Sequence, residues 1–158
     1  MIDFTISTTA FQDNGVLPVE QIYKGHGCTG ANISPDLKWE NAPDGTKSFA
    51  LIVHDPDAPV QNGWYHWIVL NIPVDITSFE KGVKIKPPMI EPLTSFNEAG
   101  YGGACPPIGH GVHHYNFVIY ALDTVLDPSI RVKKPVEIEK VVQSHSIKSA
   151  KVTALYQR

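Results

Sequence analysis

Three short apolar runs along the chain have the length and composition of buried β-strands. They extend from Ser48 to His54, from Trp64 to Ile72 and from His113 to Leu122, and each is rich in β-branched and aromatic residues. Short apolar runs bounded by turn residues favour strands over helices. Weaker runs from Asp3 to Thr8 and from Asp36 to Glu40 predict two further strands.

A helical pattern occurs late in the sequence. Pro135 suits the first position of a helix, and Ile138, Val141 and Val142 form one apolar stripe, which predicts a helix of about ten residues near Val136 to His145. The segment from Ala150 to Tyr156 could continue as helix or form a strand. Its Val, Thr and Tyr content favours the strand.

The remaining sequence is rich in turn and loop signals. The chain has 158 residues, with 12 glycines and 13 prolines, and four of the prolines fall in the segment from Pro73 to Asn97, which predicts a long irregular excursion. No internal repeat or linker divides the sequence, so residues 1–158 form one expected domain. The pattern predicts a mainly β fold, an antiparallel β-sandwich with one or two peripheral helices near the C-terminus.

Charge and cysteine content narrow the classes of function. The formal charge is −3 and the basic residues are scattered, which argues against nucleic-acid binding because phosphate contacts need a basic face. No signal-peptide pattern or apolar run of about 18 residues is present, so no membrane span is expected. Cys28 and Cys105 do not form a Cys-x-x-Cys pair and are interpreted as free thiols in a reducing compartment, which makes the protein cytoplasmic.

Strand alternation predicts that polar side chains converge at one end of the apolar strands. Successive side chains point to opposite faces, so each run has one apolar face that ends in a polar group. The predicted faces are Phe49, Leu51, Val53 and Asp55 in the first run, Trp64, His66, Ile68, Leu70 and Ile72 in the second, and His113, Tyr115, Phe117, Ile119 and Ala121 in the third.

If these strands are neighbours, Asp55, His66, His113 and Tyr115 line one concave site, with Trp64 among its apolar walls. Such a site suits a small anion, because protonated imidazoles and a tyrosine hydroxyl donate hydrogen bonds. Affinity should then weaken as the pH rises through the histidine range near ~6.5. The alternative is that these polar residues lie at strand ends only because they contact water there, and that they form no binding site.

The same residues carry a resemblance to a known family. Asp55-Pro56-Asp57-Ala58-Pro59, Trp64-Tyr65-His66-Trp67 and the segment from Gly103 to Tyr115 resemble the signature of the phosphatidylethanolamine-binding proteins, also called Raf kinase inhibitor-like proteins. The similarity extends from about Leu17 to Tyr156. The short turn from Val60 to Gly63 resembles the bacterial and archaeal branch, whose members are often homodimers.

The resemblance implies antiparallel sheets packed face to face and an anion pocket for phosphate-like head groups. By position, the implied ligand-binding residues are Asp55, Asp57, Pro59, Trp64, His66, Cys105, Pro106, His113 and Tyr115. Cys105 stands where the family often has Gly, and it narrows the lip of the pocket. A cis peptide bond at Ala58-Pro59 is expected, because the turn must aim Asp55 inward.

Other chemistries fit the sequence less well. A metal site built on His110, His113 and His114 is not expected, because adjacent residues of a strand point to opposite sides. A nucleophilic Cys105 lacks backbone N–H donors in the Pro-Pro that follows it. No cofactor is expected.

The leading hypothesis is a non-catalytic binding protein for a small ligand that bears a phosphate, phosphoryl-ethanolamine or carboxylate group. The alternative is an inhibitor or scaffold of a protein kinase or protease, regulated through the same pocket. A weaker third hypothesis is a hydrolase-like enzyme that acts on a phosphorylated or acylated small molecule through the His/Asp pocket and Cys105.

Overall fold

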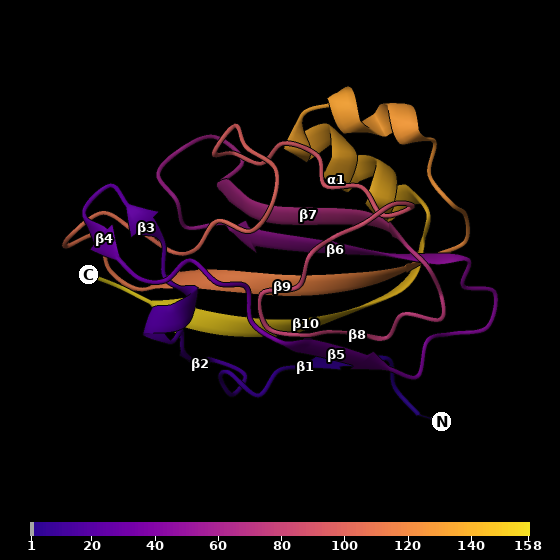
Figure 1. Cartoon of the computed structure of the whole chain (residues 1–158), viewed down its shortest axis with the longest axis horizontal. Helices are drawn as coiled ribbons and strands as arrows, with labels where there is room; N and C mark the ends of the chain where they lie inside the picture. The colour runs from indigo at the N-terminus through magenta and orange to yellow at the C-terminus, as the bar shows by residue number, and fades with distance from the viewer. Residues whose placement is uncertain (1) are drawn as a thin grey trace.

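A five-stranded sheet forms the centre of the computed structural model, which describes residues 2–158 (Figure 1). Its strand order is β2-β10-β9-β6-β7, and all neighbours are antiparallel except β2 and β10. The strands are β2 (Gly15–Val16), β6 (Ser48–Asp55), β7 (Trp64–Ile72), β9 (His113–Leu122) and β10 (Ser146–Tyr156).

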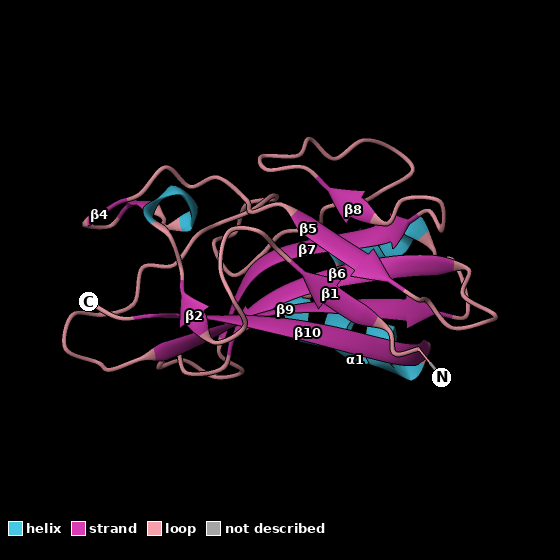
Figure 2. Cartoon of the chain, turned by 90° about the horizontal axis from the view of Figure 1, so that it is seen from below, coloured by secondary structure: helices cyan, strands magenta, loops and turns pink. Residues whose placement is uncertain are grey.

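Smaller elements cover both faces of this sheet. A three-stranded sheet of order β1-β5-β8 lies on one face, and the helix α1 (Pro135–Ser144) lies on the other (Figure 2). The remaining elements are β1 (Thr5–Ser7), β3 (Lys24–Gly25), β4 (Cys28–Thr29), β5 (Leu37–Glu40), β8 (Ser78–Phe79) and the 3₁₀ helices η1 (Val19–Gln21) and η2 (Pro128–Val132).

The predicted elements agree with this arrangement. The three apolar runs form β6, β7 and β9, the weaker runs contain β1 and β5, and the late helix is α1. The final segment is a strand, which begins earlier than predicted, at Ser146. The excursion from Pro73 to Asn97 contains only the two-residue strand β8. No helix within residues 2–158 is long and apolar enough to cross a membrane.

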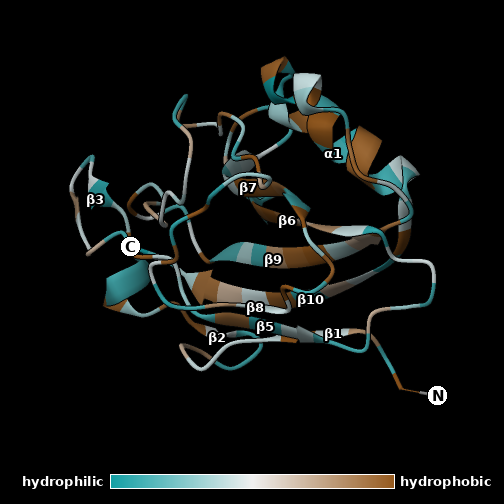
Figure 3. Ribbon diagram, turned by 45° about the vertical axis from the view of Figure 1, so that its right-hand side comes forward, coloured by the Kyte–Doolittle hydropathy of each residue, from teal (hydrophilic) through white to brown (hydrophobic). Residues whose placement is uncertain are grey.

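Two apolar layers explain why the central strands read as continuous hydrophobic runs. On β6, Phe49 and Leu51 pack toward the small sheet, whereas Ala50 and Ile52 pack toward α1, where Ile138 is fully buried. Hydrophobic residues accordingly follow the central strands and one side of α1 (Figure 3). Both faces of β6 and β7 and most of β9 are therefore removed from water, whereas the first half of β10 is exposed.

One predicted face is wrong. Ile68 and Leu70 of β7 pack on the α1 side, whereas Trp67 packs toward the small sheet. The cause is a β-bulge: Val53 pairs with Trp67, but the next residue of β6 pairs with Tyr65, so His66 has no partner of its own. The extra residue shifts the alternation, and it leaves His66 on the same face as Trp67.

A cavity at the ends of three strands

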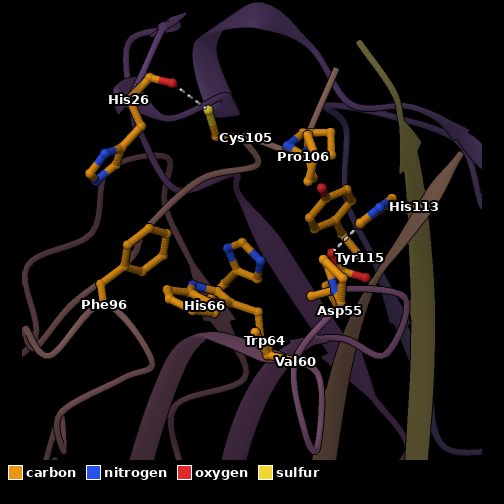
Figure 4. Close-up of a pocket in the computed structure, with 13 residues that line it drawn as sticks. His26, Asp55, Val60, Trp64, His66, Phe96, Cys105, Pro106, His113 and Tyr115 are labelled. Carbon is orange, nitrogen blue, oxygen red and sulfur yellow. Dashed lines mark hydrogen bonds and ion pairs between the residues drawn. The ribbon is translucent and has the colours of Figure 1, made fainter. Parts of the chain in front are cut away.

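A cavity of about 360 Å³ opens where β6 ends and where β7 and β9 begin (Figure 4). Because β7 and β9 both run antiparallel to β6, the C-terminal end of β6 lies beside the first residues of its two neighbours. The same end of the sheet therefore carries Asp55, Trp64 and His113. The residues predicted from the sequence that line the cavity are Asp55, Pro59, Trp64, His66, Cys105, Pro106, His113 and Tyr115.

Asp57 lies outside the cavity. Its carboxylate accepts hydrogen bonds of 2.8 Å from both the backbone N–H and Nδ1 of His114. Partial burial alone would raise the pKa of Asp57. The hydrogen bonds from His114 outweigh burial and hold this pKa below its usual range. Asp57 thus joins the turn after β6 to the start of β9, and it is not among the residues that line the cavity.

Asp55 and His113 form a buried pair at the polar end of the cavity. Asp55 Oδ2 lies 2.6 Å from Nδ1 of His113, and the two side chains are 4% and 1% exposed. The other carboxylate oxygen of Asp55 accepts the backbone N–H of Asp57 at 2.8 Å. On the far side of the ring, Nε2 of His113 lies 2.6 Å from Nδ1 of the exposed His110. Both nitrogens of His113 are therefore held by other side chains.

His66 is neutral in the cavity wall. Its Nδ1 lies 2.8 Å from the carbonyl oxygen of Gly102, and burial lowers its pKa to about 4, although that carbonyl and Asp55 favour the charged form. In the neutral ring Nδ1 carries the proton and donates to Gly102, which leaves Nε2 as an acceptor. The prediction of a protonated His66 that donates to an anion is therefore wrong, because the sequence could not show how deeply the ring is buried.

Tyr115 supplies a hydrogen-bond donor beside His66. Burial, and then the nearby charge of Asp55, raise the pKa of Tyr115 far above its usual range, so the hydroxyl keeps its proton. This hydroxyl has no hydrogen-bond partner elsewhere in residues 2–158, although the ring lines the cavity. The ring meets His66 edge to face, with the centroids 5.2 Å apart.

Apolar groups form the other walls, and the sequence did not indicate all of them. Phe96 meets Trp64 edge to face at 5.3 Å and stacks on Tyr23 at 4.7 Å, and Tyr23 in turn stacks on His26. The lining residues that were not predicted are His26, Ala58, Val60, Phe96 and Pro107. Ala58, Val60 and Pro107 lie within or beside the predicted motifs, whereas His26 and Phe96 come from distant loops without any strand pattern.

Cys105 lines the cavity as half of a disulfide. Its sulfur is bonded to Cys28, with the two Cα atoms 5.9 Å apart, so the prediction of free thiols is wrong. The two cysteines are 77 residues apart in sequence, but an isolated bridge between Ile22 and Ala104 brings their segments together. The two cysteines therefore give no support for a reducing compartment, since disulfides persist in oxidising environments.

The turn after β6 is formed without the predicted cis bond at Ala58-Pro59. The cis peptide found within residues 2–158 is Pro87-Pro88. The turn is instead shaped by the hydrogen bond from the Asp57 N–H to Asp55 and by positive φ angles of 67° and 68° at Asn62 and Gly63. A side chain at Gly63 would meet the backbone oxygen of Asp55 at 2.3 Å, so glycine is required there.

No cluster of three or more His, Cys, Asp or Glu side chains arranged to hold a metal ion occurs in the part of the chain that the structure describes. His113 and His114 point to opposite faces of β9, since His113 is buried beside Asp55 and His114 is exposed beside Asp57. Tyr115, His66 and Asp55 present hydrogen-bonding groups within the apolar walls of the cavity.

Comparisons with known proteins agree on one family. A family model described as "Phosphatidylethanolamine-binding protein" matches residues 7–157. The UPF0098 protein YbcL of Escherichia coli (strain K12) is 36% identical over 160 residues, which cover 98% of this chain and 87% of that protein. A UPF0098 protein of Methanothermobacter thermautotrophicus is 39% identical over 157 residues, with coverage of 97% and 98%.

Solved structures show the same similarity. The crystal structure of E. coli YbcL, described as a new member of the mammalian PEBP family, has a TM-score of 0.94 and 35% identity, and covers 99% of both chains. The crystal structure of CT736 from Chlamydia trachomatis has a TM-score of 0.82 and 30% identity, and covers 98% of this chain and 97% of that one.

Proposed function

Because the chain belongs to the phosphatidylethanolamine-binding protein family, of the bacterial and archaeal type, we propose that its cavity binds a small ligand with a phosphate or carboxylate group. The observation that carries the proposal is the division of the cavity into one polar end and several apolar walls. Asp55, His66 and Tyr115 form the polar end, and Trp64 and Phe96 contribute to the walls. Pockets of this size and character hold small organic molecules.

The hydrogen-bonding groups favour an oxyacid that still carries a proton. Tyr115 donates, whereas Nε2 of His66 and the carboxylate of Asp55 accept. A phosphate monoester as the monoanion matches this set, because its P–O⁻ oxygen accepts from Tyr115 and its P–OH donates to His66. The second ionisation of such a monoester has a pKa near ~6, so affinity should fall about tenfold per pH unit well above that value.

The role we propose is binding without catalysis. The nucleophilic hypothesis required a thiolate at Cys105, and this sulfur is bonded to Cys28. A disulfide sulfur has no proton to lose and no lone thiolate charge with which to attack a substrate. Asp55 and His113 then serve to hold the polar end of the cavity in position.

The proposal is tested by titrating phosphate and phosphoryl-ethanolamine into the protein at pH 6. The ring resonances of His66 and Tyr115 should shift with saturation at millimolar ligand, because both rings line the polar end. His145, which is paired with Asp123 away from the cavity, serves as the internal control and should not shift. Binding without any shift of His66 or Tyr115 would place the ligand elsewhere, and no shift of any ring would reject the proposal.

A further inference from the structure

The buried carboxylate of the cavity is connected to the protein surface by two histidine rings. Asp55 lines the cavity and contacts Nδ1 of His113, and Nε2 of His113 contacts Nδ1 of His110, each at 2.6 Å. Asp55 and His113 are almost fully buried, whereas His110 is exposed. The three groups therefore form a continuous hydrogen-bonded chain from the ligand position to solvent.

This chain keeps both hydrogen bonds in two protonation states. An ionised Asp55 only accepts, so Nδ1 of His113 carries a proton in both states. When His113 is neutral, its Nε2 accepts a proton from Nδ1 of His110. When His113 is protonated, its Nε2 donates and Nδ1 of His110 accepts. The two states differ by one proton and by one unit of charge, and neither leaves a buried group unpaired.

We propose that the chain Asp55–His113–His110 stores one proton for the site. The proton enters at Nε2 of the exposed His110, the proton on Nδ1 of His110 passes to His113, and the charge of Asp55 is balanced as an oxyanion binds beside it. His110 is thus a positioning residue that acts through His113 and does not touch the ligand. This inference rests on the proposed function, because the oxyanion is the reason for proton uptake.

Other groups near the cavity are less suited to this role. His66 is held neutral by burial, and Tyr115 keeps its proton. Both bonds of His114 go to Asp57, on the opposite face of β9. The charged and titratable groups around this hydrogen-bonded chain are Asp57, His66, His114, Tyr115, Tyr156 and Arg158. His110 is the neighbour that contacts Nε2 of His113 and also reaches solvent.

The conformation of the loop that carries His110 directs the imidazole ring of His110 toward His113 at the start of β9. Gly109 and Gly111 flank it with φ angles of 77° and 99°, and a Cβ at either glycine would meet nothing within 4 Å. Glycine is therefore favoured at these positions by backbone conformation and not by packing. The N–H of Gly109 donates to the carbonyl of Arg158 at 3.0 Å, which fixes one end of the loop.

The first test needs no ligand. Nitrogen-detected NMR of the histidine rings between pH 5 and 9 should show His110 and His113 changing over the same pH range. In His110→Asn the amide can still hydrogen-bond to His113 but does not gain or lose a proton, so the pH range of the His113 signal should move by about half a unit or more. His114→Asn is the matched control and should leave His113 unchanged. An unchanged His113 signal in His110→Asn would overturn the proposal.

The second test measures proton uptake when inorganic phosphate binds. Calorimetry at pH 7 in buffers of different ionisation enthalpy gives the protons taken up per phosphate. The ligand's own protonation is common to all variants, so wild type and His114→Asn should agree, and His110→Asn should take up fewer protons by about half a proton or more. Equal proton uptake in all three proteins would contradict the proposal that Asp55, His113 and His110 store a proton. If phosphate does not bind, the proposed function is rejected, and the first test alone decides the proposal.

Discussion

The role of each polar residue in the cavity depends on which of its atoms are already hydrogen-bonded. His113 has both ring nitrogens engaged and His66 has one, whereas the Tyr115 hydroxyl has no partner elsewhere in residues 2–158. Tyr115 is therefore the side chain best placed to donate to a ligand. Asp55 and His113 hold the end of β6 against the start of β9, and Asp55 also lines the cavity.

Tyr115→Phe should weaken phosphate binding about tenfold, the effect of losing one hydrogen bond worth about 1.4 kcal/mol. The ring stays in the core, so the free energy of unfolding should change little. Titration calorimetry gives the affinity and urea unfolding gives the stability. Tyr156→Phe, at a position outside the cavity lining, is the control and should bind phosphate like wild type. Unchanged phosphate affinity in Tyr115→Phe would show that this hydroxyl does not hydrogen-bond to the ligand.

His66 should make the protein less stable in mild acid. Its folded pKa of about 4 lies below the unfolded value near 6.5, so between these two pH values the unfolded chain binds more protons. The free energy of unfolding should therefore fall by roughly 3 kcal/mol as the pH drops from 6.5 to 4. In urea unfolding, His66→Gln should lack this part of the pH dependence; identical pH profiles would show that His66 is not buried in its neutral form.

At the scale of elements, the cavity results from loops that are held against the strand ends. The disulfide joins β4 to the loop before β9, and the turn between β3 and β4 contributes His26 to the wall. Phe96 stacks on Tyr23, next to β3, and meets Trp64 edge to face. The walls are thus fixed before a ligand arrives, which lowers the ordering cost of binding.

Removing the disulfide should affect both stability and binding. The double variant Cys28→Ser/Cys105→Ser should lose about 2–4 kcal/mol of unfolding free energy, because the cross-link closes a long loop. Its phosphate affinity should also fall, since the wall that carries His26 is no longer tethered. Wild type treated with a thiol reductant should match the variant in urea unfolding and in calorimetry. Reduced protein that unfolds and binds like the oxidised form would contradict this account of the wall.

The strands could be predicted from the sequence because their signal is local. Both faces of β6 and β9 are buried by apolar residues, and the motif around Asp55 and His113 identifies the polar end. The extra residue at His66 escaped prediction because a bulge depends on the partner strand. Phe96 and the pairing of Cys28 with Cys105 escaped for a related reason: they result from contacts between segments far apart in the sequence.

At the scale of the whole molecule, the packed middle of the large sheet and the ends of its strands have different roles. The large sheet is covered by the small sheet on one face and by α1 on the other, so its middle is packed and leaves no room for a ligand (Figure 2). The cavity forms at one end of the strands, where backbone pairing stops and loops take over. A rigid sheet therefore holds the polar groups of the site in fixed positions.

We expect the cavity to bind an oxyacid group that still carries a proton. Calorimetric titration with phenyl phosphate and phenyl sulfate at pH 6 tests it most directly, because the two ligands have similar shape but only the phosphate carries a proton at this pH. We expect phenyl phosphate to bind at least about ten times more tightly than phenyl sulfate. Equal affinity for the two ligands, or no binding of phenyl phosphate, would contradict it.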